Sequence, residues 1–75
     1  MCDWYEVRAD GRNWAALATT PHATAGDLQY ARDTARELSK VGRRHDVLAV
    51  TRGRPGETAR VTLFAYDNGK ARVLL

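Results

Sequence analysis

The residue types that most often carry enzyme chemistry stand alone in this chain. Cys2 is the one cysteine and Ser39 the one serine, and neither has a histidine at a spacing that would pair a nucleophile with a base. His22 and His45 are also isolated, so no Cys/His spacing suits a metal ion. The sequence therefore predicts a protein that is not an enzyme and that has no cofactor and no small-molecule substrate.

Two further patterns could suggest catalysis or nucleic-acid binding, but each is explained more simply by the local structure. Asp33 and Glu37 lie one helical turn apart, but arginines flank them, which is typical of a solvated helix face rather than of paired catalytic carboxylates. Residues 53–56, Gly-Arg-Pro-Gly, match the four-residue pattern with which KH domains grip a nucleic-acid backbone. In KH domains that loop joins two helices. Here it falls between two expected strands, which favours a plain hairpin turn.

The arginines and tryptophans are the one group with a plausible binding chemistry. The net charge is +3, and residues 43–60 hold five arginines against two acids. Arginine and tryptophan together could neutralise phosphates and stack on bases. Against this, three acids lie in the first 10 residues, where they would repel phosphates. Nucleic-acid binding by a small sheet is therefore the alternative hypothesis.

The bulk composition indicates one small domain covering residues 1–75. A chain of this length buries only ~60% of its unfolded surface, so its stability margin is thin. No apolar run approaches the ~18 residues that a membrane span needs. A lone cysteine fits a reducing compartment, and we expect a cytoplasmic protein that does not contact membrane.

The first half of the chain predicts two strands and a helix. Residues 3–9 and 12–20 are expected strands, joined by a tight hairpin turn at Asp10-Gly11. Thr24, with Asp27 three residues later, forms a capping-box pattern that starts the helix, although a cap at Thr20 before Pro21 is the rival. The helix carries a stripe of apolar residues at spacings of three and four, and Gly42 suits its left-handed end. The stripe consists of Leu28, Ala31, Ala35, Leu38 and Val41.

The second half predicts three more strands, at residues 46–52, 59–66 and 71–75. Pro55-Gly56 forms the first turn between them, and Asn68-Gly69 is the strongest hairpin signal in the chain. The expected fold is α+β, in the order ββαβββ. It is an antiparallel sheet of four to five strands with one amphipathic helix packed on one face.

A single helix covers only one face of such a sheet, and both faces are expected to hold large apolar groups. A two-residue turn at Asp10-Gly11 pairs Val7 with Trp14, which leaves Trp4 and Leu17 on the reverse face. One extra loop residue would move Trp14 across to join Trp4. The last hairpin is expected to group Phe64 with Thr62, Tyr66, Val73 and Leu75, and to place Leu63, Ala65, Arg72 and Leu74 on the other side.

Two interpretations of the apolar residues on the face without a helix remain open. The exposed apolar patch marks an interaction surface, or the sheet coils into a partial barrel and buries both sets. The first makes the protein a small accessory module of the inhibitor or adaptor type, which binds a protein partner or a second copy of itself through the uncovered face. The expected anchors are Trp4 or Trp14, Leu17, Phe64 and Tyr66, with Arg8, Arg52 and Arg54 as the polar rim.

Overall fold

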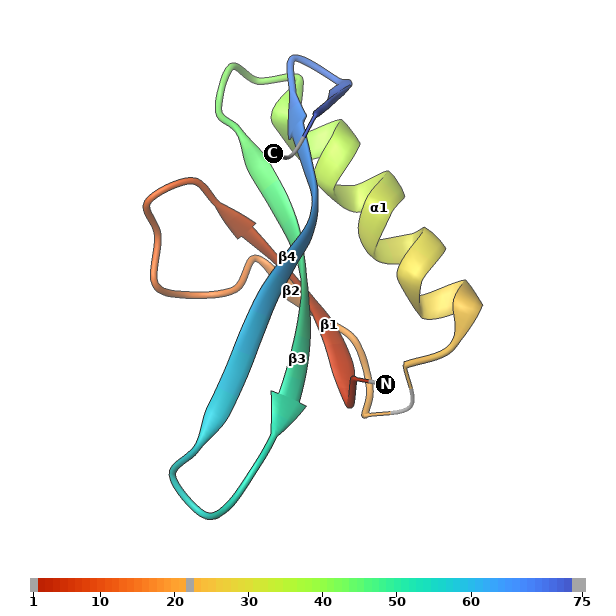
Figure 1. Ribbon diagram of the computed structural model, residues 1–75. Coiled ribbons are helices and arrows are strands. Elements are labelled where there is room, and N and C mark those ends of the chain that lie inside the picture. The colour runs from red at the N-terminus through yellow and green to blue at the C-terminus, as the bar shows by residue number, and fades with distance from the viewer. Residues whose placement is uncertain (1, 22, 74–75) are drawn as a thin grey trace.

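The computed structural model of the chain describes residues 2–21 and 23–73. It contains β1 (Trp4–Ala9), β2 (Leu17–Ala18), α1 (Ala25–Ser39), β3 (His45–Arg52), β4 (Thr58–Asp67) and β5 (Lys70–Arg72). The strands form one antiparallel sheet in the order β2-β1-β3-β4-β5, and α1 packs across one of its faces (Figure 1). The predicted α+β fold is therefore confirmed. Among the described residues, no helix is long and apolar enough to cross a membrane.

The start of α1 is fixed by the predicted capping box. The Thr24 hydroxyl accepts a hydrogen bond from the Asp27 amide at 3.0 Å, and the Asp27 carboxylate accepts one from the Thr24 amide at 3.2 Å. These two bonds satisfy amides that the first turn of a helix leaves without partners. The helix therefore begins after Thr24, and the rival cap at Thr20 is wrong.

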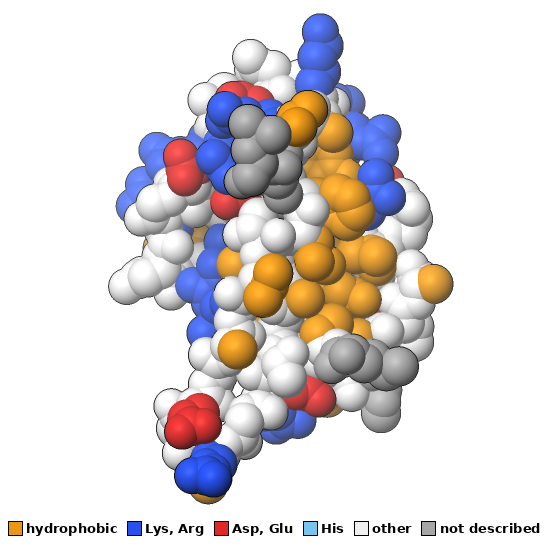
Figure 2. Space-filling view, viewed as in Figure 1, with side chains coloured by type: hydrophobic (Ala, Val, Ile, Leu, Met, Phe, Trp, Pro, Cys, Tyr) orange, Lys and Arg blue, Asp and Glu red, His pale blue; other side chains and the backbone are white. Residues whose placement is uncertain are grey.

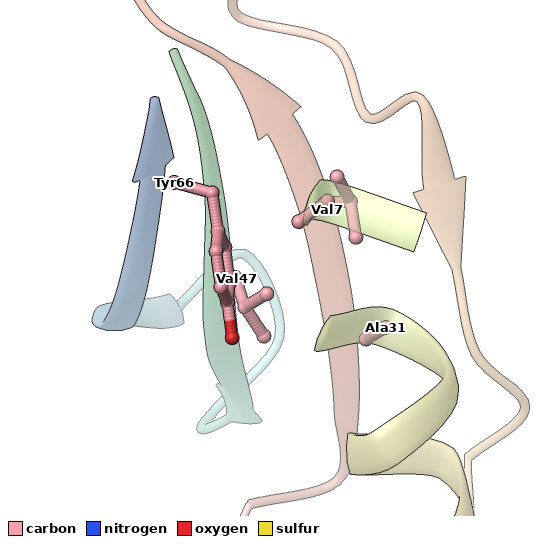
Figure 3. Packing of buried hydrophobic residues seen from close by; sticks show 5 residues of the cluster. Val7, Ala31, Val47 and Tyr66 are labelled. Carbon is pink, nitrogen blue, oxygen red and sulfur yellow. The ribbon is translucent and has the colours of Figure 1, made fainter. Parts of the chain in front are cut away.

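The core between α1 and the sheet is small. Val7 of β1 and Val47 of β3 are fully buried, and Tyr66 of β4 is 2% exposed. Ala31 and Ala35 of α1 complete this cluster, and Figure 3 shows the labelled side chains gathered between the helix and the sheet. Two of the five buried residues are alanines, so the aromatic ring of Tyr66 supplies much of the buried apolar surface.

The apolar stripe of α1 turns away from the core at its C-terminal end. Leu38 is 36% exposed and Val41 is 82% exposed, so the predicted stripe is wrong at these two positions. Ser39, the next residue after Leu38, is fully buried. Its hydroxyl donates to the Arg36 carbonyl at 2.7 Å and accepts from the Gly69 amide at 2.9 Å. This contact holds the β4–β5 turn against the end of the helix.

The second strand is much shorter than the predicted strand over residues 12–20. Gly11 adopts a φ of 77° in the expected turn, but the chain then runs as a loop and pairs again only in β2. Val7 lies opposite Leu17, where the predicted register placed Trp14. The predicted register is wrong because the connection is a loop over residues 10–16 and not a two-residue turn, and the longer loop moves the partner of Val7 from Trp14 to Leu17.

A β-bulge interrupts β4. Val47 pairs with Phe64, whereas the next residue, Leu48, pairs with Thr62, so Leu63 is an extra residue. Thr62 therefore lies on the face of Leu48, and the prediction that it shares a face with Phe64 is wrong. Strict alternation along a sequence cannot reveal a bulge, because one inserted residue moves all preceding side chains to the other face.

The Asn-Gly turn joins β4 to β5 as predicted, and it pairs Tyr66 with Ala71. β5 ends at Arg72, so Val73, which the last hairpin was expected to group with Phe64, is not part of the ladder. The residues of the predicted last strand that lie outside the described part of the chain are Leu74 and Leu75.

Candidate interaction surfaces

The predicted anchor residues are divided between the two faces of the sheet. Trp4 lies on the face opposite α1, together with Glu6 and Arg8 by strand alternation. Leu17, Phe64 and Tyr66 pack on the helix side, so their expected place on the uncovered face is wrong. Trp14 is not a strand residue; it lies in the loop before β2 and is 55% exposed. The uncovered face therefore has one of the predicted aromatic anchors.

Glu6 is the common acceptor of a hydrogen-bond network on the uncovered face. Its carboxylate accepts hydrogen bonds from Trp4 Nε1 at 3.0 Å, Arg8 Nε at 2.8 Å and Arg60 Nε at 3.0 Å. Arg60 Nη2 approaches the second carboxylate oxygen at 3.4 Å. One acidic side chain from β1 thus fixes an indole ring and two guanidinium groups, one of which comes from β4.

The charge state of Glu6 follows from these contacts. Burial raises the pKa of a carboxyl group, because the charged form loses water. Hydrogen bonds from Arg60, Trp4 and Arg8 outweigh this effect and lower the pKa of Glu6 from 4.5 to about 2. The same contact with Glu6 raises the pKa of Arg60. At neutral pH the pair is ionised, and the carboxylate offsets part of the positive charge of the face.

Arg52 extends this arrangement towards the end of β3. Its guanidinium carbon lies 5.3 Å from the centre of the Trp4 ring, within the range of a cation–π contact. Its backbone amide donates to the Asp3 carboxylate at 2.6 Å. Arg54, the third predicted rim residue, lies in the exposed β3–β4 turn. Two of the three predicted rim arginines, Arg8 and Arg52, are therefore on the face of Trp4.

The apolar residues of the uncovered face are partly covered by the chain itself. Val50, opposite Trp4 in the ladder, is fully buried, and Ala65 is 1% exposed although both face away from α1. Leu48 is half-buried and Leu63 is 36% exposed. The sheet thus buries some apolar residues on both faces, as the second interpretation expected. The accessible apolar surface of this face comes from Leu48, Leu63 and Trp4.

A second accessible region follows the outer edge of β4. β5 pairs with β4 only over residues 65–67, so residues 58–64 have no neighbouring strand on their outer side within the described chain. Val61, which lies on the helix side of this edge, is 61% exposed. Figure 2 shows hydrophobic side chains forming a band between the β3–β4 hairpin and α1. The edge therefore presents backbone groups beside an apolar surface.

The groups that could carry chemistry are engaged in structural contacts. His45 is buried, with Nδ1 2.8 Å from the Arg43 carbonyl oxygen. Asp33 and Glu37 lie near Arg36 and Lys40 in exposed pairs of 3.6 and 2.9 Å. Cys2 is half-buried, and its contact with the Tyr5 hydroxyl raises the pKa of that tyrosine.

No group of three histidine, cysteine, aspartate or glutamate side chains that could hold a metal ion occurs in the described ranges. An open hollow at the β3–β4 turn has one titratable side chain, Glu57, in its lining. His22 lies outside the described residues.

Sequence reasoning missed the central role of Glu6 and the place of Leu48. The spacing of Trp4, Glu6 and Arg8 did indicate a shared strand face. The partner across the sheet, Arg60, could not be inferred, because it lies 54 residues away and its position depends on two strand registers and a bulge.

A scan against protein-family models found no match for this chain, and searches of curated proteins and of solved structures found none either. Function is therefore inferred from the surfaces described above.

Proposed function

We propose that this protein is a small non-enzymatic interaction module that docks on a protein partner through the face of the sheet opposite α1. The network around Glu6 is the observation that carries the proposal. It holds Trp4, Arg8 and Arg60 in fixed positions before any partner arrives. Side chains that are already ordered lose less conformational entropy on binding, which favours affinity.

The residue types on this face fit a protein interface. Tryptophan and arginine are enriched among the residues that contribute most to protein–protein binding. Here they share the face with Leu48, which lies opposite Glu6 in the ladder, is half-buried and provides an apolar centre. An apolar centre with a polar and charged rim is the usual arrangement of a protein interface.

Nucleic-acid binding, the alternative function, is less well supported by the same geometry. A nucleic-acid site needs free cations for phosphates and an open aromatic ring for bases. Arg8 and Arg60 are paired with Glu6, and Arg52 lies over the ring of Trp4. We therefore place a protein partner first.

A capture experiment with matched double variants tests the proposal. The full chain is immobilised and exposed to a lysate of its source cells, beside the face variant Trp4→Ala with Leu48→Thr. The control is Trp14→Ala with Leu38→Thr, which removes the same side chains from exposed positions elsewhere. We expect a protein that wild type and control retain and that the face variant loses, by at least tenfold in affinity when the captured protein is purified and titrated.

Circular dichroism must show that all three chains are folded. Retention of the same protein by the face variant with unchanged affinity would contradict the proposal. Its loss from the control alone would do so as well, because the binding surface would then include the helix or the loop.

A further inference from the structure

We propose that two copies of this chain pair through the outer edge of β4, antiparallel over residues 60–62 and about a two-fold axis at Val61. The paired edges join two sheets side by side. This inference concerns the edge of the sheet, whereas the proposed function concerns its face, so each can be tested without the other.

The backbone groups of β4 that face outward follow from the hydrogen bonds of β3. The Asp3 amide donates to the Val50 carbonyl at 2.8 Å, so even-numbered residues of β3 direct their backbone groups towards β1. Odd-numbered residues must then face β4, because the direction alternates along an antiparallel strand. Ala49 lies opposite Val61, so Val61 also uses its backbone groups within the sheet. The residues whose amides and carbonyls point outward are Thr58, Arg60 and Thr62.

This edge lacks the usual protection against pairing. Edge strands are commonly protected by proline, by charged side chains or by being very short. Arg60 is the one charged residue in the segment Thr-Ala-Arg-Val-Thr, which contains no proline. Its guanidinium is held by Glu6 on β1, at 3.0 Å, so the charge lies over the sheet face and not beyond the edge.

The edge is complementary to itself in an antiparallel arrangement. With the axis at Val61, Arg60 of one copy lies opposite Thr62 of the other, and both residues direct their backbone groups outward. Two arginines would face each other only if the axis passed through Arg60, and like charges directly opposite are destabilising. A second copy thus satisfies the outward amides and carbonyls of Arg60 and Thr62 without opposing like charges. Thr58 takes no part, because it would lie opposite Phe64, whose backbone groups face β3.

The same axis also places the exposed Val61 side chains of the two copies against each other. Val61 is 61% exposed in the single chain and lies on the helix side of the sheet. Directly opposite residues that do not exchange hydrogen bonds have the closest side chains in an antiparallel pair. Arg72, the last residue of β5, lies beside Ala65, so β5 does not cover residues 60–62.

Mass and amide exchange of the full chain test this pairing. Light scattering over a concentration series should show a mass that rises towards twice the 8.4 kDa of the single chain. In the same series, the Arg60 and Thr62 amides should exchange with solvent at least tenfold more slowly as concentration rises. The Ala59 and Val61 amides, which face β3, serve as internal controls and should change little.

A pair of valine-to-lysine variants provides the second arm. Val61→Lys should give a monomer at every concentration, because two ammonium groups would meet at the axis. Val41→Lys makes the same change at a residue 82% exposed on the other side of the helix end, and it should remain a dimer. The Trp4→Ala, Leu48→Thr chain should also remain a dimer, which separates this proposal from the face.

A wild-type mass of 8.4 kDa at every concentration would overturn the proposal. The edge would then be open to pairing with a strand of another protein. A dimer that persists in Val61→Lys, or one without protection of Arg60 and Thr62, would also overturn it, since the contact would lie elsewhere.

Discussion

Glu6 is a carboxylate placed on a sheet face with only 5% of its surface exposed. Burying a charge without partners is costly, so the position depends on the donors that surround it. Arg60, Trp4 and Arg8 supply three such donors from two strands. Glu6 therefore links β1 to β4 across β3, and it fixes the residues of the proposed interface at the same time.

The lowered pKa of Glu6 makes part of the stability dependent on pH. The folded-state pKa is about 2, below the ordinary 4.5, so the unfolded chain binds a proton first as pH falls. The stabilisation is fully present above about pH 4.5 and is lost as pH falls from there towards 2. The difference corresponds to roughly 3 kcal/mol at neutral pH.

Replacing Glu6 by glutamine tests this linkage. We expect Glu6→Gln to lower the free energy of unfolding by about 2 kcal/mol at pH 7, since two arginines lose their charged partner. The gap between wild type and variant should shrink between pH 5 and pH 2 in urea titrations. Glu37→Gln, in an exposed pair with Lys40, is the control and should cost under about 0.5 kcal/mol. A gap that is the same at both pH values would refute the assignment.

At the scale of elements, the end of α1 and the β4–β5 turn form one unit. The Ser39 hydroxyl accepts from the Gly69 amide, and the Ser39 carbonyl accepts from the Asn68 amide at 3.1 Å. Asn68 and Gly69 both have positive φ, which this two-residue turn requires. The turn thus folds by its local sequence and is then positioned by the buried serine.

We expect Ser39→Ala to lower the free energy of unfolding by about 1–3 kcal/mol, because the half-buried Gly69 amide loses its acceptor. Chemical denaturation followed by circular dichroism measures this change. Gln29→Ala breaks the exposed hydrogen bond to Asp33 on the same helix and should cost about 0.5 kcal/mol or less. Equal effects of the two variants would show that Ser39 does not position the turn.

The sequence correctly predicted the features whose interacting residues lie close together in the chain. The cap at Thr24 and the turn at residues 68–69 were predictable because their partners lie within three residues. The register of Leu17 against Val7 and the bulge at Leu63 were not, because each depends on strands that meet only in the folded chain. The candidate site followed the same division: Trp4 was placed on the correct face, while its partners across the sheet were not identified.

At the scale of the whole molecule, one helix on a five-stranded sheet leaves two accessible regions that differ in kind. The uncovered face is rich in charge, with an ordered tryptophan and small apolar areas. The outer edge of β4 offers backbone groups and an exposed Val61. Under the two proposals, a partner on the face and a second copy at the edge would use different groups of the sheet, and a dimer would carry two face sites on one continuous sheet.

The distribution of charge over the molecule bears on the choice between a protein and a nucleic-acid partner. The net charge of +3 is small, and the arginines nearest to Trp4 are already engaged by Glu6 or by the ring itself. Asp3 and Asp46 add negative charge near the same face, and Asp46 is paired with Arg44 at 2.8 Å. Phosphate groups would have to displace these pairs.

We therefore expect random duplex DNA and single-stranded RNA to leave the tryptophan fluorescence of the full chain without a saturable change, at both low and physiological salt. The Arg52→Ala, Arg54→Ala variant should behave like wild type in the same titrations. Saturable binding that weakens steeply with salt, and that this variant reduces, would establish the alternative function, because counterion release from phosphates produces that dependence. In that case the arginines at residues 52–60, rather than the apolar area beside Trp4, would be the working surface of the sheet.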